Sequence, residues 1–144
     1  MSKSPLLGAS LLLVRDDGRL LAVTRRNSTE LSFPGGKRDK NETSDINAIR
    51  ETAEETGVYV PKSDLIHLYS ADCDTDPVSG QIYFIDTFLA HFNHTMGYPV
   101  SMEEGIEVMW VTPEIFMEKT TFKTYNQAVI DAWKAQKTNP KLML

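Results

Sequence analysis

The chain opens with two apolar runs that are separated by a polar turn. Residues 8–15 and 19–25 are rich in aliphatic side chains, and Asp16, Asp17 and Gly18 lie between them. An Asp-Gly pair between two such runs is a strong signal for a hairpin, because glycine readily adopts the backbone angles of a tight turn. The pattern therefore predicts two antiparallel strands.

A short extended segment precedes the first predicted helix. It ends at the Pro-Gly-Gly sequence of residues 34–36, where proline favours extended backbone before it and glycine permits approaches that a Cβ atom would block. A helix is predicted over residues 44–56. Thr43 or Ser44 can cap its start, and Gly57 stands where a helix ends.

The rest of the chain continues with strands and a last helix. Tyr125, Val129 and Trp133 are spaced for one buried stripe of that helix. The order strands, helix, strands, helix predicts an α/β domain over residues 1–144, with helices packed on a mixed sheet. Residues 138–144 are expected to form a flexible tail. The other expected elements are strands at 65–74, 80–92 and 106–113, a polar loop at 94–105 and a helix at 120–136.

Composition and charge narrow the classes of function. The 144 residues carry a formal net charge of −5, with a pI of about 5.2, so the chain lacks the basic footprint of a protein that binds duplex nucleic acid. The apolar stretch near the N-terminus is too short to span a bilayer, and no membrane partner is expected. Cys73 is the only cysteine, which excludes an internal disulfide and suits a reducing, cytoplasmic location.

Three glutamates crowd the end of the first predicted helix. At about 100° per residue, Glu51, Glu54 and Glu55 share one face about 100° wide. Like charges at this spacing destabilise a helix, and the last two lie where the helix dipole is already negative. A solvated face is one interpretation, whereas a bound Mg²⁺ or Mn²⁺ would neutralise the cluster. The opposite face, which is expected to pack on the sheet, carries Ile46, Ile49, Ala53 and Thr56.

The spacing over residues 36–58 is more specific than the cluster alone. Gly36, Glu42 and the motif "RETAEETGV" of residues 50–58 hold identities and offsets expected by chance on the order of 10⁻⁸ per start position. The stretch resembles the complete signature of the Nudix hydrolase family, except that Thr52 replaces a larger aliphatic residue. The resemblance implies an α/β/α sandwich with a central mixed sheet. It also implies Mg²⁺- or Mn²⁺-dependent hydrolysis of a nucleoside diphosphate linked to another moiety.

The resemblance further implies roles for individual residues of the motif. Glu51, Glu54, Glu55 and the carbonyl of Gly36 are expected at the metal. Glu51 or Glu54 is also the expected general base, which accepts a proton from the attacking water. Arg50 is expected to orient one of these carboxylates through a charge-assisted hydrogen bond, as a further catalytic residue.

Residues outside the motif complete the predicted site. In the family an acid of the polar loop often binds metal or acts as the base, and Glu104 is preferred over Glu103 because it lies nearer the next strand. Glu103 is a candidate for substrate binding, and an exposed acidic loop is the alternative for both. Arg25, Arg26 and Lys37 flank the Pro-Gly-Gly sequence and could bind phosphates or be surface charges.

The sequence leaves the substrate open. ADP-ribose, a nucleotide sugar or a dinucleoside polyphosphate is the leading type. The alternatives are hydrolysis of (oxidised) nucleoside triphosphates and a non-catalytic module that senses a nucleotide. Tyr83 faces the opposite side of its strand from Phe84 and Phe88, and either side could stack a base or fill the core. Because many relatives form dimers, a homodimer is also expected.

Overall fold

A computed structural model describes residues 5–138 of the chain. Within them, the strands are β1 (Leu6–Val14), β2 (Leu20–Thr24), β3 (Leu31–Ser32), β4 (Gly35–Lys37), β5 (Ile66–Asp72), β6 (Tyr83–His91) and β7 (Val108–Val111). The α-helices are α1 (Ser44–Thr56), α2 (Pro113–Lys119) and α3 (Lys123–Thr138). Two short 3-10 helices are η1 (Lys62–Asp64) and η2 (His94–Met96).

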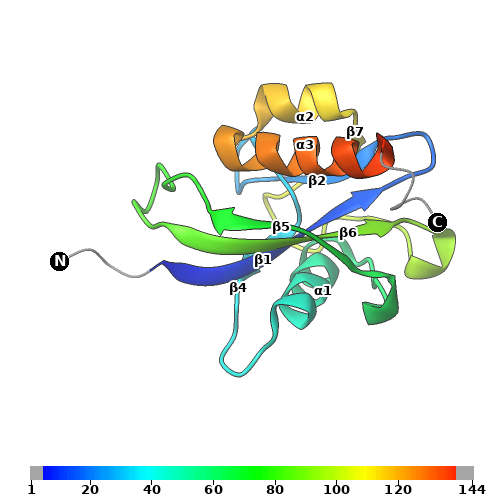
Figure 1. Cartoon of the computed structure of the whole chain (residues 1–144), viewed down its shortest axis with the longest axis horizontal. Helices are drawn as coiled ribbons and strands as arrows, with labels where there is room; N and C mark the ends of the chain where they lie inside the picture. The colour runs from blue at the N-terminus through cyan, green and yellow to red at the C-terminus, as the bar shows by residue number, and fades with distance from the viewer. Residues whose placement is uncertain (1–4, 139–144) are drawn as a thin grey trace.

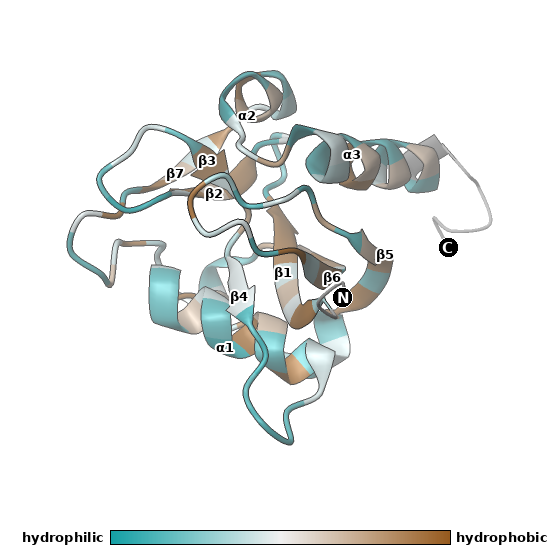
Figure 2. Ribbon diagram, turned by 90° about the vertical axis from the view of Figure 1, so that its left-hand side faces the viewer, coloured by the Kyte–Doolittle hydropathy of each residue, from teal (hydrophilic) through white to brown (hydrophobic). Residues whose placement is uncertain are grey.

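The strands of this part of the chain join into one mixed sheet. Its order is β3-β2-β1-β6-β5, with β4 paired to β1 and β7 paired to β2. β1 and β6 run parallel, and the other pairs are antiparallel. Figure 1 shows α2 and α3 on one face of the sheet and α1 on the other. Figure 2 shows hydrophobic residues gathered in the central strands between these helices, which confirms the expected α/β/α sandwich.

The predicted hairpin is present at the expected turn. The Arg15 N–H donates to the Arg19 carbonyl at 2.8 Å, and the Gly18 N–H donates to the Arg15 carbonyl at 2.9 Å. Gly18 has a φ of 85°, which glycine adopts without strain. Val14 lies opposite Leu20, and away from the turn β1 pairs with β4 and β6 instead. β1 therefore links the hairpin to the strands that surround the site.

The face of α1 that packs on the sheet differs from the prediction. Its buried residues are Asn47, Ala48, Thr52 and Thr56. Of the predicted face, only Thr56 is buried, and Ile46 is 41% exposed. The helix instead turns Glu51 and Glu55 toward β4, where glycines at positions 35 and 36 leave room for their carboxylates. The prediction was wrong because it assumed that the carboxylates point away from the sheet.

Thr52 lies within the buried face of α1, and its side chain has no exposed surface. Within the described residues, its Oγ1 atom has no hydrogen-bond partner. A buried hydroxyl without a partner costs about 1–3 kcal/mol. We therefore expect Thr52→Val, which keeps the shape of the side chain, to raise the free energy of unfolding by about 1 kcal/mol in urea denaturation. A lower free energy of unfolding in this variant would contradict an unsatisfied hydroxyl.

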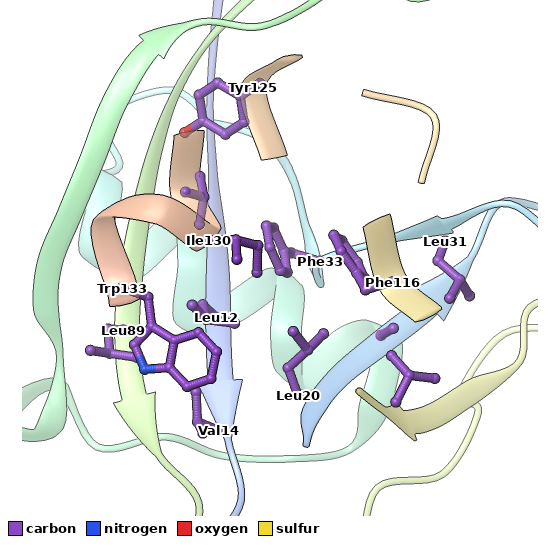
Figure 3. Packing of buried hydrophobic residues seen from close by; sticks show 13 residues of the cluster. Leu12, Val14, Leu20, Leu31, Phe33, Leu89, Phe116, Tyr125, Ile130 and Trp133 are labelled. Carbon is purple, nitrogen blue, oxygen red and sulfur yellow. The ribbon is translucent and has the colours of Figure 1, made fainter. Parts of the chain in front are cut away.

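The sequence pattern did not predict α2. The helix begins after Thr112, whose Oγ1 accepts a hydrogen bond from the Ile115 N–H at 3.3 Å, and Pro113 occupies its first turn. α2 places Phe116 in the core, where its ring stacks on Phe33 with 4.4 Å between centroids (Figure 3). This contact packs α2 against the sheet near β3, within the same core cluster as α3.

α3 covers the same face of the sheet as α2. It begins at Lys123 because the Asp74 carboxylate accepts hydrogen bonds from the first turn, including one from the Tyr125 N–H at 2.9 Å. The predicted stripe of Tyr125, Val129 and Trp133 is buried. Figure 3 shows Tyr125 and Trp133 directed into the core. The predicted start at residue 120 was therefore early, whereas the predicted buried face is confirmed.

The predicted flexible tail covers residues 138–144. Only Thr138 belongs to the described residues, and it is the last residue of α3. The prediction for residues 139–144 lies outside them. In the described part of the chain, no helix combines the length and apolar composition needed to cross a membrane.

Candidate functional site

The end of α1 is fixed by its own cap and by the loop at residues 94–105. The Gly57 N–H donates to the Ala53 carbonyl at 2.9 Å, and the φ of Gly57 is 74°, which confirms the predicted helix end. The Met102 N–H donates to the Glu55 carbonyl at 3.2 Å. Because this bond satisfies a carbonyl of the last helical turn, it also brings the loop beside the glutamate cluster.

Arg50 binds three of the motif carboxylates. Its Nε donates to Glu42 Oε2 at 2.7 Å, and its Nη1 atom donates to Glu51 Oε1 at 3.0 Å and to Glu54 Oε2 at 3.1 Å. Its Nη2 atom also donates to the Lys37 carbonyl at 3.0 Å. The hydrogen bonds from Arg50 lower the pKa of Glu42, and those carboxylates raise the pKa of Arg50. Arg50 thus contacts the carboxylates of the cluster, and the orienting role expected from the sequence stays a prediction.

Glu55 lies between α1 and β4 in a largely dry environment. Its Oε1 atom accepts a hydrogen bond from the Gly35 N–H at 2.8 Å. Burial raises the pKa of Glu55 to about 8, although the Gly35 N–H opposes this shift. Burial also raises the pKa of Glu51, partly offset by Arg50. Arg50 thus stabilises the ionised form of Glu51 in part, whereas Glu55 has only the Gly35 N–H as a stabilising partner.

Gly36 allows the Glu51 carboxylate to approach the backbone of β4. A Cβ atom at Gly36 would lie 2.5 Å from Cδ of Glu51 and 2.6 Å from its Oε2. The carbonyl of Gly36 accepts a hydrogen bond from Asn47 Nδ2 at 3.3 Å. Asn47 is fully buried in α1, so the helix holds this part of β4 in place. Glycine at position 36 thus has a steric role that the motif alone does not reveal.

The carboxylates do not form a ready-made metal site in this arrangement. Among residues 5–138, no three Asp, Glu, His or Cys side chains converge on one point that a metal ion could occupy. Glu51 and Glu54 turn to Arg50, and Glu55 turns to the Gly35 N–H. Even so, the donor set fits Mg²⁺ or Mn²⁺, because these ions favour carboxylate oxygens and Arg50 cannot neutralise three glutamates, of which Glu55 binds the Gly35 N–H instead. Binding would require Glu51 and Glu54 to turn from Arg50, and Glu55 to turn from the Gly35 N–H, toward one shared point.

The raised pKa of Glu55 predicts a pH-dependent stability in metal-free protein. Between its ordinary value of 4.5 and about 8, native Glu55 keeps a proton that the unfolded chain has lost. Because the native state then binds more protons, the free energy of unfolding falls as pH rises through this window. Denaturant unfolding at several pH values in the presence of a chelator measures this decline.

Glu55→Gln is expected to flatten that decline, because glutamine does not ionise and its oxygen can still accept from Gly35. Glu118→Gln is the matched control, since Glu118 is exposed on α2. The control should keep the slope of the wild-type protein. Equal slopes in wild type and Glu55→Gln would contradict a raised pKa at Glu55.

A cavity of about 360 Å³ lies beside the cluster and includes Glu55 in its wall. Arg25, Arg26 and Lys37, the predicted phosphate-binding residues, also line it. Tyr83 lines the cavity, whereas Phe88 packs into the core on the α1 side of the sheet. Further lining residues are Ser10, Ser32, Phe33, Gly35, Gly36, Cys73, Asp76, Ile85, Phe122, Tyr125 and Asn126. The cavity is therefore mostly apolar, and Glu55 of the carboxylate cluster forms part of its wall.

Arg25 is held by partners inside the cavity. Its Nη2 atom lies 3.1 Å from Asp76 Oδ2, and its guanidinium lies over the Phe122 ring at 5.4 Å from the centroid. Both side chains of the ion pair are mostly buried. A phosphate would therefore compete with Asp76 for Arg25.

The polar loop places Glu103, rather than Glu104, near the cluster. The charge of Glu103 contributes to the raised pKa of Glu55. Glu103 also pairs with Arg26 at 4.0 Å. Glu104 is exposed. The preference for Glu104, which rested on its position nearer β7, is not matched by this geometry.

The sequence did not identify several residues of the cavity wall. Ser10 lies on β1, Asp76 on the loop after β5, and Phe122 and Asn126 at the start of α3. They are far apart along the chain and belong to no motif. Only the tertiary structure brings them together, and no local signal in the sequence marks them.

Comparison with other proteins places the chain in a family. A family model described as "NUDIX domain" matches residues 5–133. A "MutT-like protein" of Streptomyces ambofaciens is 29% identical over 121 residues, which are 84% of this chain and 72% of that protein.

Solved structures agree with this assignment. A MutT NUDIX hydrolase from Burkholderia pseudomallei has a TM-score of 0.64 and 25% identity, covering 78% of this chain and 86% of that one. A bifunctional NMN adenylyltransferase/ADP ribose pyrophosphatase from Francisella tularensis, complexed with AMP and an Mn ion, has a TM-score of 0.68 at 18% identity. That match covers 90% of this chain but only 41% of the other, and it shows the fold alone. With its intact motif carboxylates, this chain belongs to the NUDIX domain family as a pyrophosphohydrolase.

Proposed function

We propose that the protein hydrolyses the pyrophosphate bond of a nucleoside diphosphate linked to another moiety, with Mg²⁺ or Mn²⁺ as cofactor. The observation that carries this proposal is the cavity that joins Glu55 to Arg25, Arg26 and Lys37. Its wall holds the Glu55 carboxylate of the cluster, for a cation, together with basic side chains for phosphates. ADP-ribose, a nucleotide sugar or a dinucleoside polyphosphate meets this requirement.

Each residue has a distinct role in the proposed reaction. Glu51, Glu54, Glu55 and the Gly36 carbonyl would hold the cation, which supplies charge neutralisation at the pyrophosphate and helps to activate water. Of the two candidates for the general base, Glu51 and Glu54, we favour Glu54, because its side chain is the more exposed to water. Attack of water at one phosphorus breaks one P–O–P bond. A diphosphate diester such as ADP-ribose then yields two phosphomonoesters, and a dinucleoside polyphosphate yields two nucleotides that share its phosphates.

Arg50 keeps the carboxylates in position before the cation binds. Its hydrogen bonds to Glu51 and Glu54 hold two like charges close together. Glu42 is the partner that anchors Arg50, through two hydrogen bonds of 2.7 and 3.0 Å. This two-point contact fixes the plane of the guanidinium.

The choice of Mg²⁺ or Mn²⁺ and of substrate has outside support. The Francisella protein of the same fold contains an ADP ribose pyrophosphatase and was crystallised with AMP and an Mn ion. A cytoplasmic location and a homodimer stay predictions for this chain.

A hydrolysis screen tests the proposed function. Purified protein with Mg²⁺ or Mn²⁺ is incubated with ADP-ribose, nucleotide sugars, dinucleoside polyphosphates and nucleoside triphosphates, and products are separated by chromatography. The expected result is cleavage of at least one of the first three types, ADP-ribose and nucleotide sugars to phosphomonoesters and dinucleoside polyphosphates to two nucleotides. Cleavage of triphosphates alone would favour the second substrate class. A lack of cleavage with every compound and metal would favour a module that only senses nucleotides.

A further inference from the structure

A chain of three hydroxyl groups lies beneath the cavity. Ser10 Oγ and Thr87 Oγ1 are 2.8 Å apart, and Thr87 Oγ1 and the Tyr125 hydroxyl are 2.6 Å apart. The Tyr125 hydroxyl donates to the Ile85 carbonyl at 3.0 Å. Ser10, Thr87 and Tyr125 are at most 9% exposed, so these groups rely on one another for hydrogen bonds.

All three contacts can be hydrogen bonds in only one arrangement of the protons. A carbonyl cannot donate, so the proton of Tyr125 points to Ile85. Thr87 must then donate to Tyr125, and Ser10 must donate to Thr87. Each hydroxyl has a single proton, so Ser10 has none left to offer elsewhere.

Ser10 also lines the cavity beside the carboxylate cluster. It lies opposite Gly35 in the sheet, and the absence of a Cβ atom at Gly35 keeps the surface of Ser10 clear, because that atom would lie 2.7 Å from Cβ of Ser10. Because its one proton is donated to Thr87, Ser10 Oγ has only lone pairs left for a bound molecule. Water could supply a donor there when the cavity is empty.

We propose that Ser10 is a specificity-determining residue that accepts a hydrogen bond from an N–H or O–H group of the bound nucleoside, and that Thr87 positions it as an acceptor only. The inference rests on the proposed function in that the cavity receives a nucleoside. The donor is an amino or imino group of the base, or a hydroxyl group of the sugar. A group that offers only lone pairs at this point is disfavoured, because two acceptors would face each other.

The test compares the binding of AMP, IMP and 2′-deoxy-AMP by calorimetry in the absence of metal. AMP and IMP exchange a donor and an acceptor at two neighbouring positions of the base, whereas 2′-deoxy-AMP lacks one sugar hydroxyl. In the wild-type protein, the affinities for AMP and IMP, or those for AMP and 2′-deoxy-AMP, should differ by a ratio of about ten. Ser10→Ala should bring that ratio close to one.

Thr87→Val supplies a second and more specific readout. Thr87 does not line the cavity, and valine preserves its shape. The variant releases the Ser10 proton, so Ser10 can donate as well as accept. If the base supplies the donor, the ratio of the affinities for AMP and IMP should approach one in Thr87→Val. This change would occur although Thr87 itself does not line the cavity. If the sugar supplies it, the 2′-deoxy penalty should persist in Thr87→Val and vanish in Ser10→Ala.

Ser63→Ala is the matched control, because it removes an exposed hydroxyl on η1, outside the cavity wall. It should keep the wild-type ratios. Unchanged ratios in Ser10→Ala would overturn the inference, as would a wild-type protein that binds all three ligands equally or not at all. Cleavage of ADP-ribose with no effect of Ser10 on the ratios would contradict only this inference. The expected ratios without cleavage of any compound would contradict only the proposed function.

Discussion

Glu54→Gln is expected to lower metal-dependent turnover at least about a hundredfold while the fold stays intact. Glutamine keeps the size of the side chain but cannot accept a proton, and it contributes no charge toward a cation. The Glu54 side chain is 53% exposed and contacts Arg50 at the surface of α1, so its replacement leaves the core unchanged. The loss should therefore appear in kcat rather than in stability.

The measurement is the initial rate of hydrolysis at saturating Mg²⁺, together with the thermal unfolding midpoint of each variant. Glu118→Gln removes one exposed negative charge elsewhere and should retain the wild-type rate. Wild-type turnover in Glu54→Gln would exclude this residue from both metal binding and proton transfer. A large fall in the unfolding midpoint would instead assign Glu54 a structural role.

Gly36→Ala is expected to reduce activity by about tenfold or more with little change in stability, because a 1 Å displacement of a catalytic group has effects of this size. The new methyl group would lie within 2.5–2.7 Å of the atoms of the Glu51 carboxylate. That carboxylate is the end of a flexible side chain, so it can move aside without disturbing the backbone. Glu51, one of the three glutamates proposed to bind the cation, would then be displaced from its position in the cluster.

Gly35→Ala provides the contrast, since the two glycines are neighbours in β4. Its methyl group would lie 2.5 Å from the carbonyl oxygen of Ala9 and 2.8 Å from Cα of Ser10. These backbone atoms cannot turn away, so this variant should lose stability as well as activity. Rates and denaturant midpoints for both variants distinguish the two cases. Equal destabilisation by both substitutions would contradict the steric role of Gly36.

The sequence predicts the hairpin and the bounds of α1 because the signals are local. An Asp-Gly turn and the glycine at position 57 each act through the backbone angles of a single residue. The motif spacing is equally local, which is why it identifies the fold before any packing is known.

The inward face of α1 could not be predicted by the same means. Hydrophobic periodicity assigns Ile46 to the core, yet Asn47 and Thr52 are fully buried and Ile46 is 41% exposed. Small polar residues pack here because β4 approaches the helix at two glycines and because Asn47 binds the carbonyls of β4. Helix packing on a glycine strand therefore overrides the apolar pattern.

The cavity was also beyond sequence reasoning, for a different reason. Its wall combines Ser10, Asp76 and Phe122, which come from β1, the loop after β5 and the start of α3. Its chemistry depends on which partner each group has, such as the pairing of Asp76 with Arg25. The partners of Ser10, which are Gly35 and Thr87, likewise depend on the register of β1 against β4 and β6, which no local signal specifies.

Titration of Mn²⁺ into the protein, followed by water proton relaxation, tests the metal site most directly and requires no knowledge of the substrate. Wild-type protein and Glu118→Gln should bind Mn²⁺ saturably with the same affinity. Glu54→Gln and Glu55→Gln should each weaken that affinity about tenfold or more, since each removes a carboxylate ligand. Equal affinities in all four proteins, or the absence of saturable binding, would contradict a divalent-metal site at Glu51, Glu54 and Glu55.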